Sequence, residues 1–145
     1  MNDAINGKPS ANFWIIGGAA LVWNLIGLVF YYSHVTMTPE ALAGFSAEQQ
    51  AFLASTPAWA TSAYAIAVTA GVLGCLLLLF RKSWAVPVLG LSLGGVIVQD
   101  LHAFVLSNGL QVWGSAGIIL PAVVLVIAIA LVLYARSVSA KGWLI

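Results

Sequence analysis

The sequence predicts an all-α, polytopic membrane protein whose single domain, residues 1–145, is a bundle of four transmembrane helices. Of the 145 residues, 62% are hydrophobic and only 6% are charged, whereas a soluble domain carries about a quarter charged residues. Four apolar runs are each long enough to cross about 30 Å of hydrocarbon as a helix. We place these spans at about 13–33, 60–80, 84–106 and 114–134.

Composition and motif content exclude several classes of function. A net charge of +1 offers no basic field, so nucleic acid is not an expected partner. The single cysteine, Cys75, excludes an internal disulfide and a CxxC metal or redox motif. The signatures of serine hydrolases, zinc proteases and P-loop proteins are absent from the sequence. We therefore predict neither an enzyme nor a cofactor, and assign no catalytic residue.

The first span and the loop after it carry specific local signals. One face of the first span presents small and polar residues: Gly17, Ala20, Asn24, Gly27 and Tyr31. A mid-membrane amide is costly without a partner, so Asn24 either bonds to another helix or contacts a ligand. In the 34–57 connection, Thr38-Pro39-Glu40 is a helix start and Ser46–Gln49 resembles a capping box. We expect a short amphipathic helical segment here, broken near Gly44, that acts as a spacer or as a lid.

The remaining spans differ in their small and polar residues. The second has a seam of small residues at four-residue steps: Ala63, Ala67, Gly71 and Cys75. On the third, polar or small residues share one face: Ser92, Gly95, Gln99 and His102. Gly90 and Gly94 lie on the other side, which predicts neighbours on two sides. The fourth has no polar side chain between Ile118 and Leu133 and is expected to be the most lipid-exposed.

The charge distribution predicts the orientation. With four spans, one side of the membrane receives all five basic residues: Lys8, Arg81, Lys82, Arg136 and Lys141. The other side receives none, but has Glu40 and Glu48. By the positive-inside rule, both termini are cytoplasmic, and the 34–57 loop faces out.

Six segments between about residues 13 and 143 are distinctive: Trp23-Asn24-x-x-Gly27, Met37–Glu40, Pro57-Ala58-Trp59, Ala65–Val68 with Gly71 and Gly74, Arg81-Lys82-x-Trp84-Ala85, and Ser92-Leu93 through Gln99. In these segments the chain resembles a mostly uncharacterised family of small bacterial four-helix inner-membrane proteins, some of which carry the automatic label "sugar transporter". The resemblance implies a location in the bacterial cytoplasmic (inner) membrane and the same four spans. It implies no catalytic residue.

The candidate site is an outward-facing polar pocket with these walls: Asn24, Tyr31, His34, Tyr64, Gln99, Asp100 and His102. Asp100 is the only acid within the spans, and it either faces the pocket, pairs with His34 or reaches the headgroups. A metal site of His34, Asp100 and His102 lacks a local ligand motif and is not predicted.

The expected function is to bind or transport a small polar molecule, in the lipid bilayer and with the option of a homo-oligomer. Two alternatives stay open. One is a non-catalytic accessory subunit of a larger membrane complex, packed through its small-residue faces. The other is a membrane enzyme or redox subunit that uses the His/Asp cluster.

Overall fold

The computed structural model describes residues 8–145, and within this range the secondary structure is helical. Four helices are long and apolar enough to cross a membrane. They are α2 (Ala11–Val35), α5 (Ala58–Leu79), α6 (Ala85–Leu101) with the π-helix η1 (His102–Leu106), and α8 (Ile119–Ala140) after the 3₁₀ turn η2 (Ser115–Ile118). The predicted all-α class and four membrane-length helices are thus confirmed. Residues 1–7 of the expected polar tail lie outside the described range.

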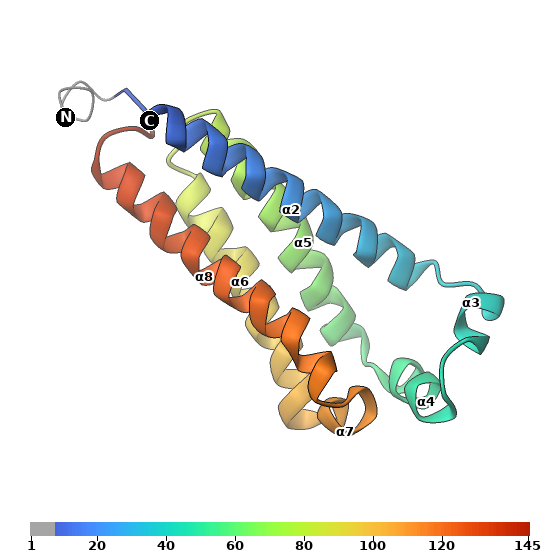
Figure 1. Ribbon diagram of the computed structural model, residues 1–145. Helices are drawn as coiled ribbons and strands as arrows, with labels where there is room; N and C mark the ends of the chain where they lie inside the picture. Colours follow the sequence, from blue (N-terminus) through green and yellow to red (C-terminus); the bar gives the residue numbers. More distant parts are fainter. Residues whose placement is uncertain (1–7) are drawn as a thin grey trace.

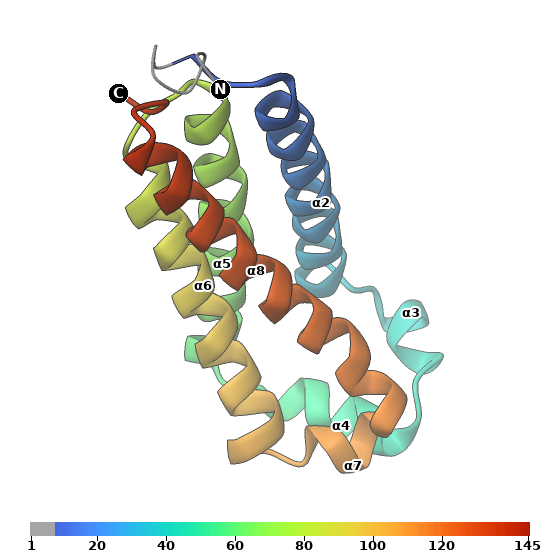
Figure 2. The same cartoon turned by 60° about the vertical axis from the view of Figure 1, so that its left-hand side comes forward.

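The long helices pack in series. Helix α5 packs against both α2 and α6, and α8 packs against α6. The start of α2, the C-terminus and the turn between α5 and α6 lie at one end of the molecule, which we call the termini end (Figure 1). The short helices α3 (Pro39–Ala43), α4 (Ala47–Ser55) and α7 (Gly109–Trp113) lie at the opposite, loop end (Figure 2).

Small residues explain the close approach of α5 and α6. The predicted seam on α5 is buried throughout. A Cβ atom added to Gly95 of α6 would lie 2.7 Å from the carbonyl oxygen of Ala63 and 2.8 Å from the amide nitrogen of Ala67. The hydroxyl of Ser92 donates a hydrogen bond of 2.6 Å to the carbonyl of Ala67, which fixes the register of the two helices.

Helix α6 has neighbours on two sides, α5 and α8, as expected, but Gly90 and Gly94 do not form the contact with the second one. A Cβ atom added to either glycine would meet nothing within 4 Å. Helix α8 instead approaches α6 beside Ala85 and Leu89, because these larger apolar side chains join the core that also contains Leu131 of α8.

That core lies at the termini end and explains why α8 is longer than expected. The fourth span was expected to end near residue 134, but the helix continues to Ala140 because Ala135 and Val138 are almost fully buried. Phe13 of α2 and Trp143 join the same cluster, with ring centroids 5.9 Å apart. Farther along the chain, the amide of Ile145 donates to the carbonyl of Arg81 at 2.6 Å.

The loop end is built from the capped short helices that the sequence predicts. The Ala41 amide donates to the hydroxyl of Thr38 at 3.2 Å and starts α3. Reciprocal bonds between Ser46 and Gln49, of 3.2 and 3.1 Å, complete the capping box of α4. Two phenylalanines of this segment pack edge-on against Trp113 of α7, so the two loops cover this end of the molecule together.

Candidate functional site

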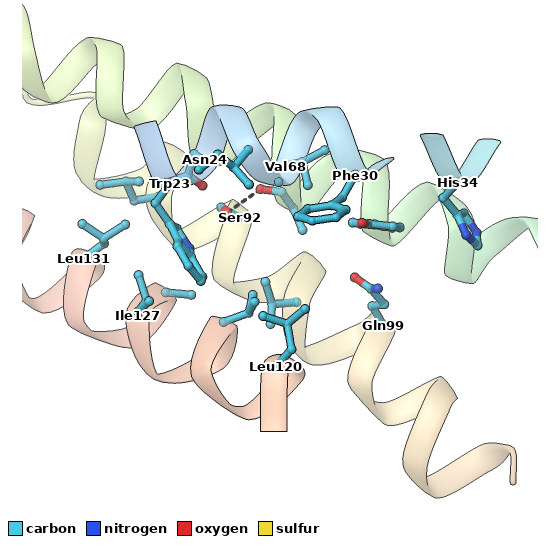
Figure 3. Close-up of a pocket in the computed structure, with 18 residues that line it drawn as sticks. Trp23, Asn24, Phe30, His34, Val68, Ser92, Gln99, Leu120, Ile127 and Leu131 are labelled. Carbon is cyan, nitrogen blue, oxygen red and sulfur yellow. Dashed lines mark hydrogen bonds between the residues drawn. The ribbon is translucent and has the colours of Figure 1, made fainter. Parts of the chain in front are cut away.

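The larger of two adjoining cavities lies between α2, α5, α6 and α8 and has a volume of about 360 Å³ (Figure 3). Its floor consists of buried side chains of α5 and α6, among them Ala67, Leu89 and Val96. Its edges are exposed side chains of α2 and α8: Phe30 is 60% exposed and Leu120 is 57% exposed. The cavity therefore opens sideways, between α2 and α8.

A second cavity of about 270 Å³ continues from the first toward the loop end. Phe45 and Phe52 from the first loop and Trp113 of α7 line it at that end. Three polar residues line both cavities and mark the passage between them, which we call the neck: His34, Tyr64 and Gln99.

Three helix ends bring the neck together. His34 lies in the last turn of α2, Tyr64 near the start of α5 and Gln99 near the end of α6. The rings of His34 and Tyr64 have centroids 5.8 Å apart. Within residues 8–145, none of these three side chains is hydrogen-bonded to another protein group. Their donors and acceptors are therefore available to water or to a ligand.

The polar groups deeper in the large cavity already bond to the protein. The amide nitrogen of Asn24 donates to the carbonyl of Ala20 at 2.9 Å and to the thiol of Cys75 at 3.4 Å. Ser92 is engaged with Ala67, as described above. Asn24 thus links α2 to α5, which is the first of the two interpretations that the sequence left open, and its side chain also lines the cavity.

His102 lines the second cavity only. It is the first residue of the π-helix η1, and its Nε2 pairs with the hydroxyl of Ser107, five residues on, at 3.0 Å. The indole of Trp59 stands perpendicular to the imidazole, with centroids 5.2 Å apart, and Phe52 lies at 6.3 Å. The imidazole is therefore held in place from two helices and a loop.

The other two candidate residues lie apart from these cavities. Tyr31 lines a shallow surface hollow with Thr61 and Ile66, and its ring packs edge-on behind Tyr64 at 5.1 Å. Asp100 does not line the cavities described here, and the described part of the chain offers its carboxylate no hydrogen bond or ion pair. The reason is angular: Gln99 and His102 share the side of α6 that faces α5, and Asp100 is turned about 100° away from Gln99.

The apolar walls of the large cavity were not among the sequence candidates. Trp23 and Phe30 of α2 and Val124 and Ile127 of α8 form much of them. An indole deep in a span is a signal for a cavity, since Trp normally prefers the interface. Helix α8 carries no such signal, because its cavity-lining residues are of the same type as the exposed residues on its other sides.

No protein-family model, curated protein or solved structure matches the chain. Among residues 8–145, no group of three or more His, Cys, Asp or Glu side chains is arranged to hold a metal ion. The site is therefore described by its own geometry: an apolar cavity with a polar neck.

Proposed function

We propose that the protein is a multi-pass protein of the bacterial cytoplasmic membrane that binds a small molecule in the joined cavities. The observation that carries the proposal is the neck, where three polar side chains have no hydrogen-bond partner among residues 8–145. Inside a bilayer, an unsatisfied polar group costs several kcal/mol. Groups of this kind are retained where water or a ligand satisfies them.

The charge distribution supports an orientation with both termini in the cytoplasm. The positive-inside rule then places the loop end, with the neck and the second cavity, toward the outside. The termini end is closed by the core around Phe13, Leu78 and Trp143. Binding from the outer side needs no change in that core, whereas transport across the membrane requires it to open.

The chemistry of the cavities favours binding over catalysis. His34 and His102 are the imidazoles of the two cavities, and neither has an acidic partner among the described residues that would orient it as a general base. Cys75 is fully buried and bonded to Asn24, which removes it as a nucleophile.

A paired cavity-filling experiment tests the binding function. Ala128 lines the large cavity from α8, and Ala130, two residues on, is exposed on another side of the same helix. Ala128→Phe fills the cavity, while Ala130→Phe adds the same side chain outside it. We expect native mass spectrometry of protein purified in mild detergent to show a bound small molecule in the wild type and in Ala130→Phe, and its loss in Ala128→Phe. Unchanged occupancy in Ala128→Phe would rule out this cavity as the site.

A second candidate function is that of a non-catalytic accessory subunit of a larger membrane complex. The open glycines favour it: Gly90 and Gly94 of α6, and Gly18 of α2, leave space at the surface that a neighbouring helix can approach closely. Gly94→Leu would block such an approach while leaving the fold intact. If this function holds, the purified complex should lose mass in this variant, whereas an unchanged mass argues against it.

A further inference from the structure

We propose that the ligand is a neutral amphipath drawn from the bilayer leaflet at the loop end. Its hydrogen-bonding head lies at the neck, and its apolar body lies in the large cavity between α2 and α8. This inference rests on the proposed binding function and names the class of ligand for the same site.

The distribution of polarity along the cavities calls for a ligand with one polar end. Below the neck, the walls are apolar side chains from all four long helices, including Trp23, Val68, Val124 and Ile127. On this lower part, the Ser92 hydroxyl and the Asn24 amide nitrogen already donate to the protein, which leaves the Asn24 carbonyl oxygen and the Trp23 indole N–H as its few other polar groups. A uniformly polar molecule would leave most of its groups unpaired against these walls, at a cost of about 1–3 kcal/mol for each group.

The lining also argues for a neutral head. Among residues 8–145, no Lys, Arg, Asp or Glu lines either cavity, and Asp100 lies outside both. A charged head would therefore be desolvated without a carboxylate, ammonium or guanidinium partner, which is strongly unfavourable. The neck can both donate and accept, through the imidazole of His34, the hydroxyl of Tyr64 and the amide of Gln99. Hydroxyl and carbonyl heads match this set.

The direction of the site matches that of a lipid in the leaflet at the loop end. The neck lies at the loop-side ends of α2, α5 and α6, where a headgroup would be, and the apolar cavity runs from it toward the middle of the helices. The exposed edges at Ile26, Phe30 and Leu120 lie along membrane-length helices, so the sideways opening faces hydrocarbon. Toward the loop end, the second cavity is also open, and the aromatic side chains of Phe45, Phe52 and Trp113 line it there.

The size of the large cavity limits the apolar body. A volume of about 360 Å³ lies at the lower end of the range for ligand pockets, roughly 300–1,000 Å³. This favours a single chain or a single ring system over a phospholipid with two acyl chains.

Photolabelling of the full chain in lipid nanodiscs tests the inference. The probe is a long-chain primary alcohol with a diazirine midway along the chain. Matched probes carry the same chain with a sulfonate or a quaternary ammonium head. We expect the alcohol to label segments 23–30 and 120–131, and unlabelled alcohol, but not glucose, to compete. Gln99→Leu and Tyr64→Phe should each reduce this labelling about tenfold, while the neighbouring controls Asp100→Asn and Tyr31→Phe should leave it unchanged.

Each other outcome has a defined meaning. Equal labelling by the charged probes, or labelling that Gln99→Leu and Tyr64→Phe do not change, shows non-specific lipid contact only and overturns the inference. If glucose competes or binds and the alcohol does not label the cavity, the ligand is a polar solute: the proposed binding function stands and this inference fails. If no probe labels the cavity and Ala128→Phe loses no bound molecule, both fail together.

Discussion

Replacing Gly95 with alanine should separate α5 from α6, whereas the same change at Gly94 should be harmless. At Gly95 the new methyl group would lie 2.7 Å from the carbonyl oxygen of Ala63 and 2.8 Å from the amide nitrogen of Ala67. Both are backbone atoms, so neither can rotate away. At Gly94 the same atom meets nothing within 4 Å. The two variants therefore differ in packing but not in composition.

The magnitude follows from the contact distances. The methyl group that Gly95→Ala introduces would lie roughly 0.7 Å closer to the carbonyl oxygen of Ala63 than the 3.4 Å at which ordinary contact begins, so the helices must move apart. Overpacking of this kind costs about 1–3 kcal/mol. Loss of the nearby Ser92–Ala67 hydrogen bond adds about 0.5–1.5 kcal/mol. Each Gly→Ala substitution raises the intrinsic helix propensity by up to about 1 kcal/mol, so this contribution cancels when the two variants are compared. Gly95→Ala should be less stable than Gly94→Ala by about 2–4 kcal/mol.

The chain carries its own probe for this measurement. Cys75 is the single cysteine and is fully buried, so a maleimide reaches it only when the fold opens. When opening and closing are fast, the labelling rate follows the open population. A difference of about 2–4 kcal/mol corresponds to labelling roughly 30 to 700 times faster in Gly95→Ala than in Gly94→Ala. Equal rates in the two variants would refute the close approach of α5 and α6 at this point.

Three further predictions concern the two ends of the molecule and Asp100. Ser46→Ala removes the hydroxyl that accepts from the Gln49 amide in the capping box and should weaken α4 by about 0.5–2 kcal/mol, seen as faster amide exchange at residues 47–50 with α5 unchanged. Trp143→Ala leaves a cavity beside Phe13 and should lower the free energy of unfolding by about 3–5 kcal/mol, measured by denaturation in detergent; a loss under 1 kcal/mol contradicts the packing. Asp100→Asn should keep the same occupancy of bound ligand in native mass spectrometry, because Asp100 lies outside the cavities; loss of ligand would place it in the site.

Local spacing explains which parts of the fold could be predicted. A helix cap needs only a few consecutive residues, so Thr38 and Ser46 marked the starts of α3 and α4 correctly. A seam of small residues at four-residue steps identifies a helix face, and the seam from Ala63 to Cys75 is buried as expected. Which helix covers that face is not a local property, and the sequence left it open.

The candidate site was predictable in part for the same reason. His34, Tyr64 and Gln99 stand out as polar residues near the ends of apolar runs, and the structure brings them to one passage between two cavities. Asp100 stands out as strongly as Gln99. Gln99 lines the cavities and Asp100 does not, because consecutive residues of a helix point about 100° apart. Only the position of α5 decides which of these two sides is the interior.

The sequence by itself determined the four membrane-length helices, the caps of the short ones and the gathering of basic residues at one end, because hydropathy, capping and charge are properties of short stretches. The tertiary structure alone decided that α8 packs mainly on α6, that the featureless apolar side of α8 becomes the wall of a cavity, and that the imidazole of His102, at the start of the π-helix, pairs with the hydroxyl of Ser107. These outcomes depend on side-chain volumes meeting across helices that lie far apart in the chain. Gly94 and Gly95 show the difference most simply: they are adjacent and identical in the sequence, yet one meets open space and the other the backbone of α5.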